Sequence, residues 1–136
     1  MSARYMLDTD ICIRFRSRRS ETVLNRVGAL QAGEASMSVI TYGELLLGVE
    51  KAPDPRRAAT VLGTLTNLIA VEPMSRGAGK HYAVIRADLE RRGEVIGAND
   101  LWIAAHARSL GLTLVTNNER EFRRVPGLSV ENWATA

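Results

Sequence analysis

Four acidic side chains stand beside short apolar segments of this 136-residue chain, although they lie far apart in the sequence: Asp8, Glu44, Asp100 and Glu121. Carboxylates that a fold gathers into one place repel one another, so at least one must hold a proton or a cation must bind between them. A ligand set of oxygen atoms with no accompanying Cys or His favours Mg²⁺ or Mn²⁺ over zinc. The four carboxylates therefore predict a divalent-metal site.

The same residues also have ordinary structural interpretations, because acidic and hydroxyl side chains often cap helices. Glu44 fits this interpretation least well. On a helix it shares a face with Ile40 and Leu47, where an unpaired carboxylate is costly. The candidates for capping are Asp8, Asn99 with Asp100 in the first turn, Thr41 with Glu44, and Thr116 with Glu119.

The elements that must position these residues are short apolar strands alternating with helices. Such alternation predicts one domain spanning 1–136, an α/β fold built as a three-layer α/β/α sandwich around a central, mostly parallel sheet. Ligands of such sheets bind at the carboxyl ends of the strands. The predicted strands are 5–7, 35–39, 69–71 and 112–116, with a final edge strand at 128–130 after a loop or turn. The predicted helices are 8–15, 21–30 with Ser20 as its N-cap, 40–51, 56–68, 75–92 and 99–110.

Composition excludes several classes of protein. With 46% hydrophobic and 24% charged residues, the chain is typical of a globular domain and too apolar for a disordered one. A single cysteine excludes an internal disulfide framework and a Cys-rich zinc site. No apolar segment reaches the ~20 residues of a membrane helix, and no signal-peptide core fits before Asp8. We therefore expect a cytoplasmic protein that does not bind a membrane.

The formal net charge is +3, and all basic residues except Lys51 and Lys80 are arginines. Arginine pairs with phosphate through two parallel hydrogen bonds, which favours a polyanionic partner. The alternative is that the arginine bias reflects genomic base composition. The arginines crowd three short segments: Arg14 to Arg19, Arg91 with Arg92, and Arg120 to Arg124.

Other residue types that could do chemistry have simpler interpretations. Cys12 lies between two isoleucines and is interpreted as a small core thiol rather than a nucleophile. Neither His81 nor His106 has a spacing typical of a metal site or a catalytic triad, and both are interpreted as structural or surface residues. No P-loop, dinucleotide-binding fingerprint or nucleophile elbow occurs in the sequence.

Four blocks of sequence, in order along the whole chain, resemble the PIN-domain family and specifically the VapC toxins of bacterial and archaeal toxin–antitoxin pairs. The blocks are MLDTDICI from Met6, SVITYGEL from Ser38, IGANDLWIA from Ile96, and LVTNN from Leu114 with Glu121-Phe122 and Glu131 to Trp133. The resemblance implies an α/β/α sandwich and an Mg²⁺-dependent endoribonuclease that hydrolyses RNA phosphodiester bonds with metal-activated water.

Carried over to this sequence, the resemblance makes Asp8, Glu44 and Asp100 the main acidic residues around the metal. Many relatives have an aspartate at the position of Asn118, so here Glu121 is the candidate for the fourth acidic position. Thr9, Asn99, Thr116 and Asn118 are then the residues that orient water or phosphate.

The resemblance also implies partners: a cognate VapB-like antitoxin docked on exposed apolar residues of the first four helices, an RNA substrate, a homodimer, and a higher assembly with the antitoxin. Two rival interpretations stay open. One is a phosphotransfer aspartate protein centred on Asp8, which lacks the expected late lysine because the last one is Lys80. The other is a PIN-like module that binds RNA or a partner without cleaving. The RNA target and the number of metal ions are left open.

Overall fold

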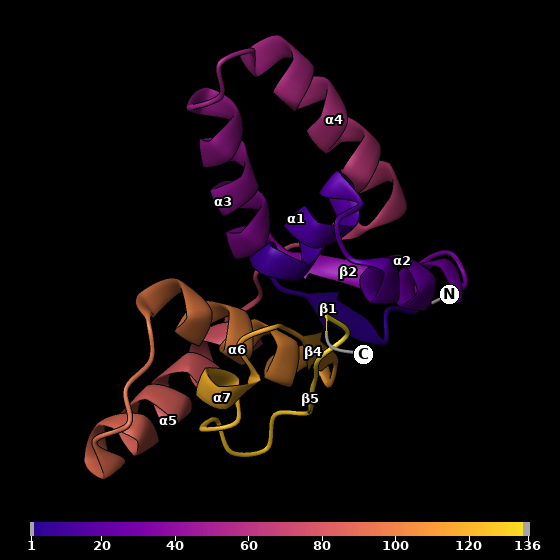
Figure 1. Ribbon diagram of the computed structural model, residues 1–136. Helices are drawn as coiled ribbons and strands as arrows, with labels where there is room; N and C mark the ends of the chain where they lie inside the picture. The colour runs from indigo at the N-terminus through magenta and orange to yellow at the C-terminus, as the bar shows by residue number, and fades with distance from the viewer. Residues whose placement is uncertain (1, 135–136) are drawn as a thin grey trace.

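The computed structural model describes residues 2–134 and is built around one five-stranded sheet. The strand order is β3-β2-β1-β4-β5, and every pair of neighbouring strands is parallel. The strands are short and lie at the centre of the molecule (Figure 1). Their bounds are β1 Tyr5–Leu7, β2 Ala35–Ser38, β3 Ala70–Glu72, β4 Thr113–Val115 and β5 Val130–Glu131.

Helices cover both faces of the sheet, so the predicted α/β/α sandwich is confirmed (Figure 1). One layer holds α1 Thr9–Ser17, α2 Glu21–Gly28, α3 Val39–Glu50 and α4 Pro55–Leu68. The other holds α5 Arg76–Arg92, α6 Ala98–Leu110 and the short α7 Glu119–Phe122. In Figure 1, α3 and α4 form a long hairpin that extends away from the sheet.

Local signals in the sequence fix where these helices begin and end. Ser20 accepts a hydrogen bond from the Val23 amide and caps α2 as predicted. At the start of α4, Asp54 caps the helix and Pro55 occupies the first turn, where a missing N–H costs nothing. Gly111 ends α6 with a left-handed φ of 69°, which a side chain rarely adopts.

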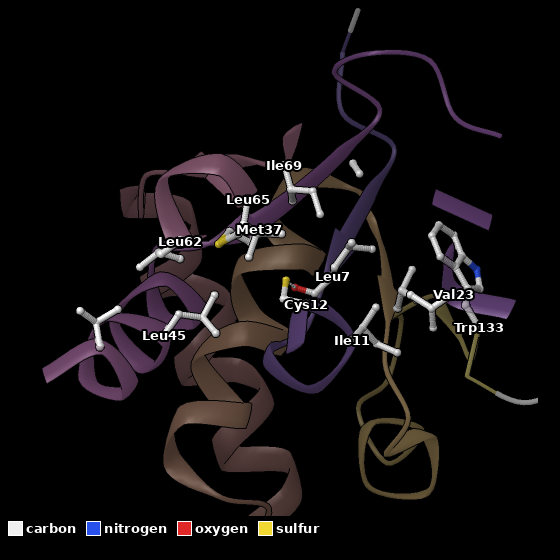
Figure 2. Packing of buried hydrophobic residues seen from close by; sticks show 13 residues of the cluster. Leu7, Ile11, Cys12, Val23, Met37, Leu45, Leu62, Leu65, Ile69 and Trp133 are labelled. Carbon is white, nitrogen blue, oxygen red and sulfur yellow. Dashed lines mark hydrogen bonds between the residues drawn. The ribbon is translucent and has the colours of Figure 1, made fainter. Parts of the chain in front are cut away.

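Each face of the sheet buries its own apolar cluster. Side chains of β1 and β2 pack with α1 to α4 on one face, as Figure 2 shows for Leu7, Met37 and Leu65. On the other face, Ile85 and Leu114 belong to a cluster that includes α5 and α6. Alternate residues of a strand point to opposite faces, so three-residue strands suffice to join both clusters.

Cys12 lies inside the first cluster, fully buried and close to Leu65 and Met37 (Figure 2). Its Sγ faces the Leu7 carbonyl oxygen at 3.8 Å, and burial raises the pKa of the thiol above its ordinary value. A thiol that is fully buried and protonated is not a nucleophile. The interpretation of Cys12 as a core residue is therefore confirmed.

Most of the predicted element boundaries differ from the structure by one or two residues, and three differences in the middle and near the end of the chain have a physical reason. The third strand is shifted by one residue, because α4 continues to Leu68 and Ile69 serves as its C-cap. The segment predicted as a loop or turn after Thr116 contains α7, which is too short to show a periodic pattern. The final strand is Val130–Glu131 rather than 128–130, because its register is set by pairing with Leu114 and Val115.

No helix within residues 2–134 combines the length and the apolar character needed to cross a bilayer.

The C-terminal segment is anchored by Trp133, whose side chain is almost completely buried against the Tyr5 ring at a centroid distance of 5.0 Å. We expect Trp133→Ala to lower the free energy of unfolding by about 3–5 kcal/mol, because it leaves a large cavity. Chemical denaturation measures the loss, and Val84→Ala on the exposed face of α5 is the control. A loss below about 1 kcal/mol would contradict this role of Trp133.

Candidate active site

Two polar side chains directly follow the central strands β1 and β4, where the order in which strands are added to the sheet reverses. After β1 the chain adds β2 and then β3 on one side, whereas β4 lies on the other side of β1. Such a switch leaves a crevice at the carboxyl ends of the two strands. Asp8 follows β1 and Thr116 follows β4, so both lie at this crevice.

Asp8 is held in place by three contacts. Its backbone N–H donates to the Val115 carbonyl at 2.9 Å, continuing the pairing of β1 with β4. One carboxylate oxygen, Oδ1, accepts the Ile11 N–H at 3.1 Å and caps α1, so the capping interpretation of Asp8 is confirmed. The other oxygen, Oδ2, accepts a hydrogen bond from the Thr116 hydroxyl at 2.5 Å.

Glu44 reaches the same place from α3. The Thr9 hydroxyl donates to Glu44 Oε1 at 2.5 Å, and the Asn99 amide lies 3.5 Å from Oε2. A further contact joins the Thr9 and Thr41 hydroxyls at 3.3 Å. The carboxylate of Glu44 therefore has polar partners from α1 and α6, which explains how a helix that is otherwise apolar tolerates it.

Asp100 and Glu121 are neighbouring carboxyl groups, and each one shifts the pKa of the other. Burial, followed by the neighbouring Glu121, raises the pKa of Asp100 to about 7. Burial also raises the pKa of Glu121, but hydrogen bonds from Asp100, Asn118 and the Gly97 N–H outweigh it and lower that pKa overall. The Asn118 amide donates at 2.7 Å and the Gly97 N–H at 3.2 Å. Asp100 is therefore the more basic of the two carboxyl groups.

The carboxyl groups surround one open cavity of about 280 Å³. Burial also raises the pKa of Asp8 to about 6, with Asp10 and Glu44 adding repulsion. Asp100 senses the negative charge of Asp8 and Glu44 as well. The gathering of Asp8, Glu44 and Asp100 that the sequence predicted is therefore present. The residues that line the cavity are Asp8, Thr9, Asp10, Ile13, Glu44, Asp100, Asn118 and Phe122.

The donor set fits a hard divalent cation. It consists of carboxylate and hydroxyl oxygens, and burial together with the nearby negative charges raises the pKa of two of the carboxyl groups, so a cation beside them would favour their ionised forms. Within residues 2–134, no three acidic, histidine or cysteine side chains are already arranged around a common point as metal ligands. Hydrogen bonds to Thr9, Thr116 and Glu121 hold the carboxyl groups in their present arrangement.

Three capping interpretations from the sequence are wrong. The N-cap of α6 is Gly97, and Asn99 lies inside the helix with its amide directed at Glu44. Ser38 caps α3, so Thr41 is a helical residue that contacts Thr9 instead. At α7 the N-cap is Asn118, whereas the Thr116 hydroxyl donates a hydrogen bond to Asp8. Of the three observed N-caps, Ser38 alone makes a side-chain capping hydrogen bond, and Gly97 and Asn118 make none.

Two features of the cavity were missed. Asp10 lines it, although its carboxylate also pairs with Arg14 at 2.8 Å. The Gly97 N–H donates a hydrogen bond to Glu121.

Some arginines of the three arginine-rich segments form intramolecular ion pairs. Arg92, for example, pairs with Asp88 and Glu94. Contact between these segments and RNA stays a prediction.

Comparison with known proteins gives a consistent result. Residues 5–128 match the model of the PIN domain. The chain is 42% identical to Ribonuclease VapC2 of Haemophilus influenzae over 130 residues, which is 96% of this chain and 98% of the relative. It is 41% identical over 131 residues to the tRNA(fMet)-specific endonuclease VapC of Shigella flexneri, again covering 96% and 98% of the two chains.

Solved structures agree with the sequence comparison. The structure of VapBC-1 from nontypeable Haemophilus influenzae superposes with a TM-score of 0.90 at 35% identity, over 96% of this chain and 98% of that one. The DNA-bound VapBC of Salmonella typhimurium also has a TM-score of 0.90, at 38% identity and with the same coverage. The phosphotransfer interpretation is thereby set aside. The chain belongs to the PIN-domain family and, within it, to the VapC proteins.

Proposed function

We propose that this protein is an endoribonuclease and the toxin of a VapBC-type pair, neutralised by a cognate antitoxin. One observation carries the proposal: Asp8, Glu44 and Asp100 line one cavity at the switch point of a VapC fold. The relatives from Haemophilus influenzae and Shigella flexneri bear the names of a ribonuclease and a tRNA(fMet)-specific endonuclease. RNA, with initiator tRNA as the first molecule to test, is the substrate class that follows.

The proposed cofactor is Mg²⁺, with Mn²⁺ as the alternative. Asp8, Asp100 and Glu44 are the residues that would hold it, because they share the cavity and their mutual repulsion favours a cation. Such an ion, when bound, lowers the pKa of an attacking water and offsets the charge of the scissile phosphate.

The residues of the chain itself supply position and charge. Thr116 and Thr9 fix the carboxylates of Asp8 and Glu44 through short hydrogen bonds, so little reorganisation is needed when substrate binds. Glu121, held by Asn118, takes the fourth acidic position. Despite burial, the neighbouring Asp100, Asn118 and the Gly97 N–H lower its pKa and so keep it negatively charged beside the other acidic groups.

The proposed docking surface for the antitoxin is the groove that runs along α4, beside α3 at one end and α1 at the other. Two adjoining cavities there share Arg16 and Val61, and the second extends to Leu68. Val61 is 40% exposed and Leu68 is 61% exposed, and apolar side chains grouped on a surface in this way are typical of a protein interface. A homodimer and a higher assembly with the antitoxin stay predictions.

We expect Asp8→Asn and Asp100→Asn each to reduce cleavage of initiator tRNA by roughly 10³-fold or more, because each removes a ligand of the cation and its charge. Gel analysis of end-labelled RNA measures the rate. The controls are Asp88→Asn and Glu119→Gln, acidic residues whose side chains pair with arginines away from the cavity. Cleavage that persists in excess chelator, or in Asp8→Asn, would contradict the proposal. Binding of RNA without any cleavage by the wild type would favour the non-enzymatic alternative.

The raised pKa values predict how the metal-free protein responds to pH. The folded state binds protons on Asp8 and Asp100 more tightly than the unfolded state, whose aspartates have the ordinary value of 3.8. This contribution to stability is complete below pH ~3.8 and is lost as pH rises through about 6 to 7. We therefore expect a lower free energy of unfolding at pH 8 than at pH 5.5 in the presence of chelator.

Asp8→Asn should raise the free energy of unfolding at pH 8 by about 2 kcal/mol, since the charge is lost and asparagine still caps α1. Added Mg²⁺ should stabilise the wild type at pH 8 and leave this variant nearly unchanged. Urea denaturation at the two pH values provides the measurement. A variant less stable than the wild type at pH 8 would show that the Asp8 carboxylate stabilises the folded protein more than its repulsion and burial destabilise it.

For the antitoxin, we expect Val61→Asp to weaken binding at least tenfold, because it replaces an exposed apolar contact of the groove with a hydrated carboxylate. Calorimetric titration with the cognate antitoxin measures the affinity, and initiator tRNA cleavage by the variant should equal that of the wild type. The control is Val84→Asp on α5, an exposed valine outside the groove. Unchanged affinity in Val61→Asp would exclude this groove as the docking surface.

A further inference from the structure

His106 is a fully buried histidine on α6, and both of its ring nitrogens have partners from other elements. Nδ1 lies 2.7 Å from the hydroxyl of Ser38, and Nε2 lies 3.1 Å from the backbone carbonyl of Pro73. Ser38 is itself buried and is the N-cap of α3, where its hydroxyl accepts the Ile40 N–H at 3.1 Å. The histidine therefore ties α6 to the junction between β2 and α3.

The partners determine where the protons are. A carbonyl oxygen can only accept, so Nε2 carries the proton, and in a neutral ring Nδ1 then accepts from the Ser38 hydroxyl. Burial lowers the pKa of His106, although the Pro73 carbonyl and the charge of Glu72 act in the opposite direction, so the neutral ring is the favoured form. Every polar atom of the chain of hydrogen bonds from Ile40 through Ser38 and His106 to Pro73 is satisfied.

The contact between Ser38 and His106 has a counterpart at the cavity. Six residues after Ser38, Glu44 meets the amide of Asn99, which lies seven residues before His106. From Ser38 to Glu44 the chain advances along α3, while the contacted residues on α6 go back from His106 to Asn99. The two helices therefore cross antiparallel. The contacts are separated by roughly 9 Å along α3 and roughly 10 Å along α6, at 1.5 Å per residue. Together the two contacts fix the same segments of α3 and α6 relative to each other.

The register between these helices matters because they carry different carboxyl groups of the cavity. Glu44 belongs to α3, and Asp100 lies in the first turn of α6. A slip of one residue would displace Glu44 by about 1.5 Å, and errors near 1 Å in such sites cost about two orders of magnitude in rate. Apolar contacts between helices tolerate small shifts, whereas a buried hydrogen bond has one geometry.

We propose that His106 is a positioning residue that, through Ser38, sets the register of α3 against α6 and so places Glu44 opposite Asp100. The inference rests on the proposed function for its effect on metal binding and cleavage, but the register itself is a property of the metal-free protein. His106 does not line the cavity and forms no hydrogen bond with a residue that does, so it is not a catalytic residue.

Three substitutions separate the two hydrogen bonds of the ring. In His106→Asn the amide oxygen lies near the position of Nδ1 and keeps an acceptor for Ser38. In His106→Gln the amide nitrogen lies near the position of Nε2 and keeps a donor for Pro73, whereas His106→Leu keeps neither. All three should lower the free energy of unfolding. Ile103→Val, a buried residue of α6 outside this network, is the control for loss of stability alone.

The probe is Mn²⁺ alone, titrated into each folded variant by calorimetry. We expect His106→Gln and His106→Leu to bind Mn²⁺ roughly tenfold or more weakly, and His106→Asn and Ile103→Val to stay within about threefold of the wild type. Cleavage of initiator tRNA should follow the same order. Affinities that follow the stability of the variants instead, or that are equal in all of them, would overturn the proposal.

A second readout needs neither metal nor activity. The side-chain amide signal of Asn99 in the NMR spectrum of metal-free protein reports its contact with Glu44. We expect it to move in His106→Gln and His106→Leu and to stay in place in His106→Asn. If the wild type bound no Mn²⁺ and cleaved no RNA, the proposed function would fail, and this pattern would still support the role of His106. An Asn99 signal unchanged in all three variants would overturn it.

Discussion

Burial of carboxyl groups that also repel one another is the constraint on which the rest of this structure depends. The fold partly removes Asp8, Glu44 and Asp100 from water and brings them to one cavity. Burial is the larger cause and repulsion adds to it, so the pKa of Asp8 rises to about 6 and that of Asp100 to about 7. An arrangement that lowers the free energy of unfolding of the metal-free protein is typical of a functional site, where residues are selected for binding rather than for stability.

The surrounding structure is organised to hold these groups against their repulsion. A parallel sheet whose order changes direction at β1 puts Asp8 beside Thr116, and the helices on the two faces deliver Glu44 and Asp100. Asp8 and Glu44 each accept from a neutral hydroxyl rather than from a cation, and Asp100 lies beside Glu121, whereas Asp10 pairs with Arg14. A lysine or arginine would neutralise the cavity permanently, whereas these polar partners fix the oxygens and leave room for a cation.

The sequence predicted the layers of the fold and the carboxylates of the cavity because both depend on local patterns. Short apolar runs ended by acidic residues are visible in the letters, as are the blocks around Asp8 and Glu44. What failed depended on contacts between distant segments. The interpretation of Asn99 as a cap was wrong because its partner, Glu44, lies on another helix. The sequence identifies His106 only as a structural or surface residue. Its contact with Ser38 depends on how α6 packs against the start of α3.

We propose that these carboxyl groups form one site for a divalent cation. The decisive experiment is a crystal of the free protein soaked in Mn²⁺, with data collected at a wavelength where manganese scatters anomalously. We expect an anomalous peak within bonding distance of carboxylate oxygens of Asp8 and Asp100, with Glu44 beside it. A peak elsewhere on the molecule, or none at saturating Mn²⁺, would exclude this site.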